Sequence, residues 1–511
     1  MQLDARRLPD RATLDADLCI VGAGPAGLTL AAELVDWPAK VVVVESGSWE
    51  SEPAAQLLNS AAVAGDPHAG LEKSRRRQIG GTTQIWNTPL APSDGAKFVP
   101  LDPLDFRGEL GRPPWPIQFA DLEQHYARAQ AVAGLGRFDY EGSGWNLPAS
   151  PIPTDHPILA SRIYQFGTSD RFCEHLPNVL ASAQNITLCH SATAVRLRWR
   201  HSAVEALEAI SAAKTRLTIN TRWLVLAGGG IENARMLLVE ADAGNLRDES
   251  GWLGRGFMEH PRDHSVRIQS NTRKQFARLE FFDARPVAGI TVCGRIAIRE
   301  HAILGQDLPN ASITLLPSGR SWRPFHWRIE SMAWRRLGWN LQWPPGYGWS
   351  RLHPLARRFD GFQLLINLEE FPNSDNRLVL DSEGDRFGVP RVRLLRHWHR
   401  ADEERLIRLR AVVARSLREM GLGPLAIGPL GPPDPNSHHH LGTTRTGSDP
   451  KLGVTNSQGQ VFGTENLFVL GGSLFPAAGY ANPTLTIMAL ALRLAGHFRA
   501  DLSCGRAARA E

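Results

Sequence analysis

The sequence predicts an α/β fold: a Rossmann-like domain that carries an inserted α+β domain. The first observation is a unit of buried strand, glycine turn and helix near the N-terminus, over residues 17–36. The same order of elements recurs in the middle of the chain, at 222–240, and near its end, at 466–498. Because these units are far apart along the chain, the domain that they build is discontinuous. The stretches between them are left to form the second domain.

Length and composition are those of a globular protein. The chain has 511 residues, of which 42% are hydrophobic and 21% charged, enough for two or three domains with buried cores. It contains no apolar run of about 18 residues, so we expect no transmembrane helix. The N-terminus carries an arginine pair but no apolar segment, which predicts no cleaved signal and a cytoplasmic protein.

Cysteine and charge patterns argue against several other classes. The five cysteines are scattered and form no Cys-x-x-Cys pair, which argues against a disulfide framework or a cysteine-based zinc site. The net charge of +5 is small for this length and suits an anionic ligand. No pattern typical of nucleic-acid binding is present, so no nucleic-acid partner is expected.

The first glycine turn is typical of a dinucleotide site. The strand "DLCIV" (17–21) leads into Gly22, Gly24 and Gly27 in G-x-G-x-x-G spacing. In this reading the first glycine allows the tight turn, the second lets backbone approach a pyrophosphate, and the third lets the helix pack on the strand. Glu45 ends the next strand and is placed to accept hydrogen bonds from ribose hydroxyls. An acid there repels the 2′-phosphate of NADP, so FAD and NAD remain; an ordinary tight β-α turn is the other interpretation.

Three later stretches extend this pattern. "QIGGTTQIWNTPL" (78–90) can run along a ligand backbone, or form a plain loop near a strand end. "RWLVLAGGGIENARMLLVE" (222–240) predicts a buried strand, a glycine turn and a helix. "NLFVLGG" (466–472) predicts a strand, and a helix follows with Pro483 in its first turn, where a missing N–H costs little.

Taken in order, these pieces resemble the glucose–methanol–choline (GMC) oxidoreductase family, whose members are FAD enzymes. The segments that carry the resemblance are "VGAGPAGLTLAAEL", "IGGTTQIWN", "LAGGGIENARMLL", "WLGRGFMEHP", "EEFPNSDNRLVL", "HHHLGTTRTG" and "ANPTLTIMALALR". Two of them, "HHLGTTRTG" and "GYANPTLT", look most like the branch that holds pyranose oxidase and bacterial sugar or polyol dehydrogenases.

The resemblance implies a p-hydroxybenzoate-hydroxylase-like architecture with two domains. A discontinuous FAD-binding domain is expected over 14–100, 180–268 and 435–500. A substrate-binding domain, built on an antiparallel sheet, is expected over 101–179 and 269–434.

The resemblance also implies catalytic roles near the C-terminus. His439 stands three residues before Gly442, where the family places the base that takes the hydroxyl proton while hydride passes to flavin N5. A neutral imidazole suits this role, although His438 and His440 remain alternatives. Asn482 is the partner, because its amide can donate to the substrate oxygen. Three adjacent histidines cannot readily point at one ion, so no metal site is predicted.

Contacts to FAD follow from the same resemblance. The residues expected to bind it are Gly22, Gly24, Gly27, Glu45, Gly80, Gly81, Asn87, Val195, Gly228, Gly472, Ser473, Pro483 and Thr484. The helix after Asn482 is expected to aim its N-terminus at the negative charge of a reduced flavin. Pyranose oxidase has a covalently attached histidine just before the tryptophan of "IGGTTQIWN". This chain has Ile85 ahead of Trp86, so FAD is expected to be non-covalent.

The expected function is oxidation of an alcohol group in a sugar, glycoside or polyol, with oxygen or a quinone or electron-transfer protein as electron acceptor. Alternatives are a natural-product tailoring oxidase for an amino sugar or hydrophobic alcohol, a flavin-dependent lyase, and a flavin-free NAD-binding or regulatory protein. Residues 320–351 hold six tryptophans and many arginines. They predict a flap packed on the core, a membrane or partner contact, or an aromatic substrate platform.

Overall fold

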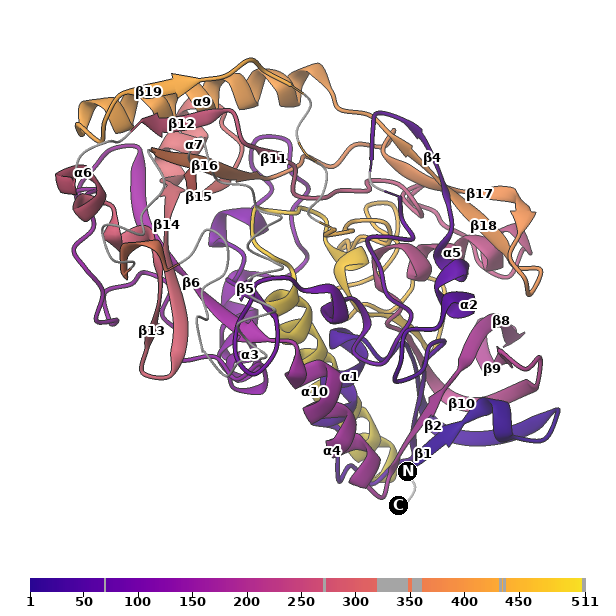
Figure 1. The fold of residues 1–511 in the computed structure, drawn as a ribbon. Helices are drawn as coiled ribbons and strands as arrows, with labels where there is room; N and C mark the ends of the chain where they lie inside the picture. The colour runs from indigo at the N-terminus through magenta and orange to yellow at the C-terminus, as the bar shows by residue number, and fades with distance from the viewer. Residues whose placement is uncertain are drawn as a thin grey trace.

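The computed structural model describes residues 1–68, 70–269, 273–318, 348–351, 361–431, 434 and 438–507. The described strands form an eight-stranded sheet, a nine-stranded sheet and a small three-stranded sheet (Figure 1). The α/β fold with a second domain built on an antiparallel sheet is therefore confirmed. The predicted division of the chain into five segments stays a prediction.

The eight-stranded sheet follows the order β1-β7-β3-β2-β10-β9-β8, with β20 also paired to β10. Its strands are β1 (Gln2–Asp4), β2 (Ala12–Val21), β3 (Val41–Val44), β7 (Ile186–His190), β8 (Ala192–Arg200), β9 (Ala203–Ser211), β10 (Arg216–Leu226) and β20 (Leu467–Val469). β1, β7, β3, β2, β10 and β20 pair in parallel, whereas β8, β9 and β10 form an antiparallel meander. The all-valine β3 is buried throughout, as expected for a parallel strand covered on both faces.

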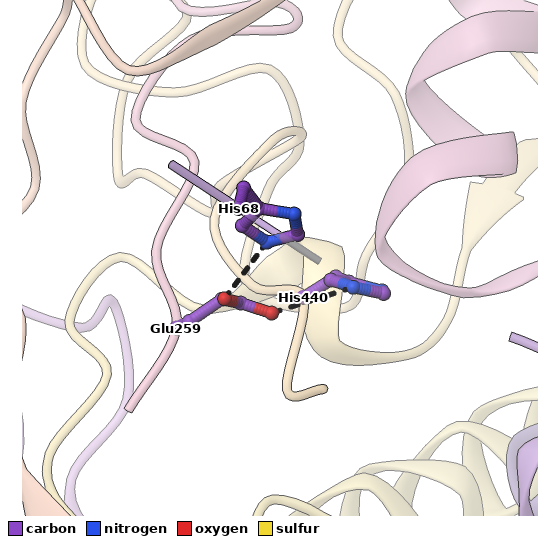
Figure 2. Close-up of side chains that lie close together, drawn as sticks. All are labelled: His68, Glu259 and His440. Atoms are coloured by element: carbon purple, nitrogen blue, oxygen red, sulfur yellow. Dashed lines mark hydrogen bonds and ion pairs between the residues drawn. The ribbon is translucent and has the colours of Figure 1, made fainter. Parts of the chain in front are cut away.

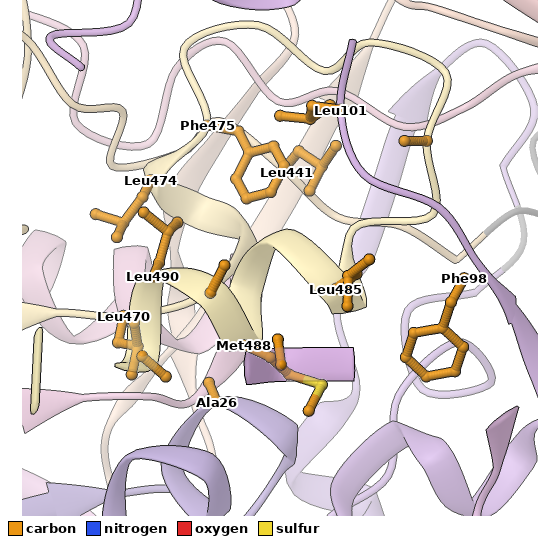
Figure 3. Close-up of a cluster of buried hydrophobic side chains, with 14 of the residues drawn as sticks. Ala26, Phe98, Leu101, Leu441, Leu470, Leu474, Phe475, Leu485, Met488 and Leu490 are labelled. Atoms are coloured by element: carbon orange, nitrogen blue, oxygen red, sulfur yellow. The ribbon is translucent and has the colours of Figure 1, made fainter. Parts of the chain in front are cut away.

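Three helices follow the predicted glycine turns of this domain. They are α1 (Pro25–Glu33), α5 (Gly229–Asp242) and α10 (Thr484–Ala507). α10 is the long yellow helix that runs through the middle of Figure 1. Figure 3 shows its first turns surrounded by apolar side chains: Leu485, Met488 and Leu490 lie among Ala26 of α1 and Leu470 and Leu474 beside β20. Burial of these side chains fixes where α10 begins.

Helix α3 (Phe119–Val132) lies in sequence between two strands of the nine-stranded sheet but packs against α10. The hydroxyl groups of Tyr126 on α3 and Thr486 on α10 are 2.9 Å apart, and both side chains are fully buried. The smaller helices α2 (Pro53–Gln56) and α4 (Leu176–Ser182) also precede the second half of the eight-stranded sheet.

The nine-stranded sheet follows the order β19-β12-β16-β15-β14-β6-β5, with β11 on β16 and β13 on β14. All its pairs are antiparallel. Its strands are β5 (Gly95–Phe98), β6 (Leu159–Thr168), β11 (Arg262–Asp263), β12 (Val266–Gln269), β13 (Ala284–Val287), β14 (Ile290–Ile298), β15 (Ala311–Ser318), β16 (Gly361–Leu368) and β19 (Leu425–Ile427). The helices of this region are α6 (Arg273–Arg278), α7 (Glu300–Gln306) and α9 (Arg400–Glu419). α9 runs beside β19 along the top of Figure 1.

The third sheet joins β4 (Ala62–Gly65), β18 (Pro390–Arg396) and β17 (Arg377–Gly384). It lies against α5 at the right of Figure 1. Most of the Trp/Arg-rich segment 320–351 lies outside the described residues. Its described end includes Trp349, which is buried against Phe362 at 4.7 Å between ring centroids. Within the described chain, every helix is too short or too polar to serve as a membrane span.

Candidate active site and cofactor cavity

A cavity lies where the first glycine turn, the Gly-Gly turn at 80–81 and the start of α10 converge. The predicted residues that line it are Gly22, Gly24, Glu45, Gly81, Gly228, His439, Gly472, Asn482, Pro483 and Thr484. The cavity thus joins the predicted nucleotide residues at one end to the predicted catalytic pair.

The three glycines of the first turn have different surroundings. Gly22 has φ +116°, and a Cβ there would lie 2.5 Å from the Ala227 oxygen. A Cβ on Gly27 would lie 2.0 Å from the Gly22 oxygen, so this glycine lets the helix pack on the turn. A Cβ on Gly24 would approach nothing closer than the Gly81 Cα at 3.9 Å, and Gly24 lines the cavity. A side chain on Gly24 would therefore fill the cavity.

Glu45 lies on the cavity wall at the end of β3 and is buried. Its carboxylate accepts hydrogen bonds from the backbone N–H of Ala23 at 2.9 Å and of Gly47 at 2.8 Å. Burial raises the pKa of this carboxyl, and the two backbone donors act in the opposite direction. The carboxylate thus holds the first turn in place, and its remaining lone pairs are available to a ribose hydroxyl.

His439 lies at the junction of several groups near the start of α10. Its Nε2 is 3.4 Å from the Nδ2 of Asn482, and its Nδ1 is 2.8 Å from the Nδ1 of His260. The Nε2 of His260 is 3.3 Å from the Ala478 carbonyl oxygen. Burial lowers the pKa of His439 well below its usual value, and electrostatic interactions with His260, Arg262 and Lys97 lower it further.

His440 points into a different environment (Figure 2). Its Nε2 is 3.1 Å from the Ser74 hydroxyl and 3.4 Å from the Glu259 carboxylate. His68 contacts the other oxygen of Glu259 at 3.0 Å. Burial lowers the pKa of His440 to about 3, so it is neutral at pH 7. The nitrogen and oxygen atoms of His68, Glu259 and His440 lie within 4.8 Å of one another, a spacing that metal ligands also have.

His438 also lines the cavity, with φ +58°, and its Nδ1 has no partner among the described residues. The three adjacent histidines therefore face three different environments. Among them only His439 has a hydrogen bond to Asn482, the pairing that the sequence predicts.

Several predicted cofactor residues lie next to the cavity without lining it. Gly80 donates its N–H to the Ala23 oxygen at 2.8 Å and so joins the two glycine turns. The Ser473 hydroxyl accepts from Asn233 at 3.0 Å. Asn87 is exposed, and Val195 lies outside the cavity lining, which β8 provides through Ala192 and Ala194.

Sequence reasoning missed His260, His68 and Glu259 as members of the site. Glu259 and His260 belong to the segment "GFMEHP", whose resemblance to the family was noted without a role for either residue. No local pattern singles out His68.

Comparison with known proteins supports the expected resemblance over part of the chain. A family model described as GMC oxidoreductase matches residues 372–491. Paromamine 6'-oxidase from Streptomyces fradiae is 26% identical to this protein, over 95% of this chain and 92% of its own length. 2-Methyl-1,2-propanediol dehydrogenase from Mycolicibacterium austroafricanum is 23% identical, over 93% and 94% of the two chains.

Solved structures show the same fold. Pyridoxine 4-oxidase from Mesorbium loti aligns with a TM-score of 0.58 at 17% identity, covering 94% of this chain and 99% of that chain. An FAD-dependent oxidoreductase from Chaetomium thermophilum aligns with a TM-score of 0.56 at 16% identity, covering 96% and 100% of the two chains.

Similarity to the GMC oxidoreductases supports FAD as the cofactor, and the cavity residues fit it. Gly24 leaves room for a pyrophosphate, as its open Cβ position shows. The first N–H groups of α10, which begin at Thr484, have no acceptor within the helix and favour an anionic group. Asn59 is 1% exposed and lines the cavity, and its Nδ2 has no partner within the described part of the chain. An unpaired buried donor on the wall is expected where a polar ligand binds.

Proposed function

We propose that this protein oxidises a CH–OH group of a sugar, glycoside or polyol to a carbonyl, with His439 as the base. The observation that carries the proposal is the hydrogen bond between His439 and Asn482 on the wall of the cavity. FAD, when bound, supplies the acceptor for the hydride. The names of the relatives, an oxidase of paromamine and a dehydrogenase of a propanediol, support this class of substrate.

The hydrogen bonds of the histidine pair set which nitrogen of His439 carries a proton. A carbonyl only accepts, so Nε2 of His260 must be the donor to Ala478. Because the pKa of His260 is lowered to about 4, chiefly by burial, its ring is neutral and Nδ1 is left as an acceptor. Nδ1 of His439 must then donate across the 2.8 Å contact. The lone pair of His439 is therefore on Nε2, beside Asn482.

This arrangement suits proton abstraction from an alcohol. Nε2 of His439 can take the hydroxyl proton, and the charge that forms is shared through Nδ1–H with His260. Asn482 cannot titrate, so its amide donates to the substrate oxygen and holds the alcohol against the base. The N-terminus of α10 favours the negative charge that a hydride acceptor gains.

We infer that FAD is bound without a covalent bond at the Gly-Gly segment, because Ile85 offers no nucleophile ahead of Trp86. The electron acceptor is oxygen or a quinone or electron-transfer protein. Relatives of both kinds support either choice, since one is named an oxidase and another a dehydrogenase.

The test is anaerobic loss of the flavin absorbance of the purified holoenzyme with sugars, glycosides and polyols. We expect one class to bleach the flavin, and His439→Ala to retain FAD but lose most of this reduction. The control is His301→Ala, an exposed histidine on α7. If His439→Ala reduces its flavin as fast as the wild type, His439 is not the base. If no alcohol reduces a flavin that dithionite can reduce, the proposed function is wrong.

A further inference from the structure

Two cations lie on one face of the nine-stranded sheet, on either side of Tyr164. Lys97 on β5 pairs with Phe166 on β6, and Cys293 on β14 pairs with Tyr164. Because side chains alternate along a strand, Lys97, Tyr164 and Arg295 share a face. Nζ of Lys97 is 4.6 Å from the centroid of the Tyr164 ring, and the guanidinium carbon of Arg295 is 5.2 Å from it.

This face lies close to the catalytic pair. The guanidinium carbon of Arg295 is 4.6 Å from the ring centroid of Tyr480, which precedes Asn482 by two residues. The positive charge of Lys97 is near enough to His439 to help lower the pKa of that imidazole. Ala96, the neighbour of Lys97 on β5, lines the cavity together with His439.

Neither cation has a carboxylate partner among the described residues. Nζ of Lys97 and Nη1 of Arg295 are both inaccessible and without a hydrogen-bond partner there. The Arg295 side chain, 2% exposed, donates from Nε to the Ile163 oxygen at 3.3 Å. Burial lowers its pKa, but Tyr480, Tyr164 and Asp102 raise it, and the net shift is upward. The Tyr480 hydroxyl is also buried, and it lies close enough to Arg295 to raise the pKa of that guanidinium.

The energy of the aromatic contacts does not offset the cost of burying the Lys97 and Arg295 charges. A cation over a ring gains about 0.5–2 kcal/mol, whereas burying an ion costs several kcal/mol unless it is paired. Burial lowers the pKa of the Lys97 ammonium, and the charges of Arg262 and Arg295 lower it further. An anion in contact with both Lys97 and Arg295 would offset both costs and meet the unused donors with charge-assisted hydrogen bonds.

We propose that the alcohol oxidised at His439 carries an anionic oxygen group, a carboxylate or a phosphate ester, that Lys97 and Arg295 bind. This inference rests on the proposed function and narrows it to acidic sugars or polyols. The same two cations repel an ammonium group, so a protonated amino sugar is a poor substrate.

The first experiment compares anaerobic flavin reduction of the holoenzyme by glucose, glucosamine, gluconate, glucuronate and glucose 6-phosphate. At least one anionic compound should reduce the flavin about ten times more efficiently than glucose, and glucosamine should be the slowest. The two acids and the phosphate ester separate carboxylate from phosphate. If glucose or glucosamine is as efficient as every anionic compound, the inference is wrong while the proposed function stands.

A second experiment does not depend on turnover. Gluconate and inorganic phosphate are titrated into the oxidised holoenzyme while the flavin spectrum is followed. Lys97→Gln and Arg295→Gln should each weaken the binding of one of these anions by about 10- to 100-fold, the range for hydrogen bonds to charged groups. Lys451→Gln, at an exposed lysine, is the control. FAD content reports folding, and Lys97→Arg should retain binding.

Equal dissociation constants in the wild type and both glutamine variants overturn the proposal, as does a wild-type spectrum that neither anion changes. Loss of anion binding in Lys97→Gln with FAD retained supports it, even where no alcohol in the panel reduces the flavin. In that case only the proposed function is contradicted, and the anion site stands.

Discussion

Replacing His260 with alanine should slow flavin reduction while FAD stays bound. His260 touches His439 through a 2.8 Å contact between the two Nδ1 atoms, and it does not line the cofactor cavity. In the wild type, His260 accepts the hydrogen bond that keeps the His439 proton on Nδ1, so that Nε2 is free to act as the base. The alanine variant removes this acceptor. It also removes the group that shares the positive charge once His439 is protonated.

The size of the effect follows from the hydrogen bond that is lost. A hydrogen bond to a charged group contributes about 1.5–3 kcal/mol, and 1.36 kcal/mol corresponds to a factor of ten. The rate constant for flavin reduction should therefore fall roughly 10- to 150-fold. Stopped-flow absorbance under anaerobic conditions measures this rate constant at saturating alcohol.

A matched series separates positioning from packing. His260→Gln places an amide oxygen that can accept from the His439 Nδ1–H, so it should recover part of the lost rate. His301→Ala, on the surface of α7, should have the wild-type rate. Wild-type reduction in His260→Ala would refute the reasoning, and so would a glutamine variant no faster than alanine at equal FAD content.

Three further predictions concern the base, the turn and the core. Since burial lowers the pKa of His439 well below its usual value, the imidazole is neutral from pH 8 down through 6.5. The rate of flavin reduction should therefore stay constant over that range and fall only at more acid pH. A fall in rate centred at or above pH 6.5 would contradict this. Gly24→Leu should fold but lose FAD, because its side chain would enter the cavity. Gly27→Leu should not fold, because its Cβ meets backbone at 2.0 Å. Flavin absorbance and circular dichroism distinguish the two variants, and a Gly24→Leu protein that still binds flavin would show that the turn does not face the cofactor. Glu369→Gln breaks a fully buried ion pair with Arg112 at 2.6 Å and should lower the free energy of unfolding by about 3–5 kcal/mol. Urea titration measures this free energy. A change below about 1 kcal/mol would mean that the uncompensated arginine finds another partner.

Local patterns predicted the elements that surround the cavity. The strand, glycine turn and helix at 17–36 appear as β2 and α1, and the apolar helix after Pro483 appears as α10. Each of these signals lies within about 30 residues, since hydrophobic periodicity and glycine placement are local properties. The sequence therefore sufficed to predict the elements that line the cavity.

The partners of the histidines could not be predicted in this way. His260 meets His439 because Met258 and Leu441 form an antiparallel bridge, and no local pattern sets the register of two segments so far apart. The same bridge brings Glu259 beside His440. The strand β8 shows a related limit, because its bulge near Ala194 affects which side chains face the cavity. Val195 was predicted to bind the cofactor, but its neighbour Ala194 lines the cavity instead.

The sheet to which a short strand belongs was harder still to predict. β5 and β12 fall inside the segments predicted for the FAD-binding domain, yet both pair within the nine-stranded sheet. A short buried strand has the same apolar composition in either sheet, so its partner depends on contacts that the sequence does not display.

The contact between α3 and α10 limits how this enzyme can be divided or recombined. Tyr126 on α3 closes over Thr486 in the turn of α10 that follows Pro483, so a helix outside the eight-stranded sheet completes the packing around the cofactor helix. A chimera that takes residues 101–179 from a relative would import a foreign surface against α10. A chimera should therefore acquire the relative's substrate preference when α3 and α10 come from the same parent. When they come from different parents, the chimera should lose its flavin.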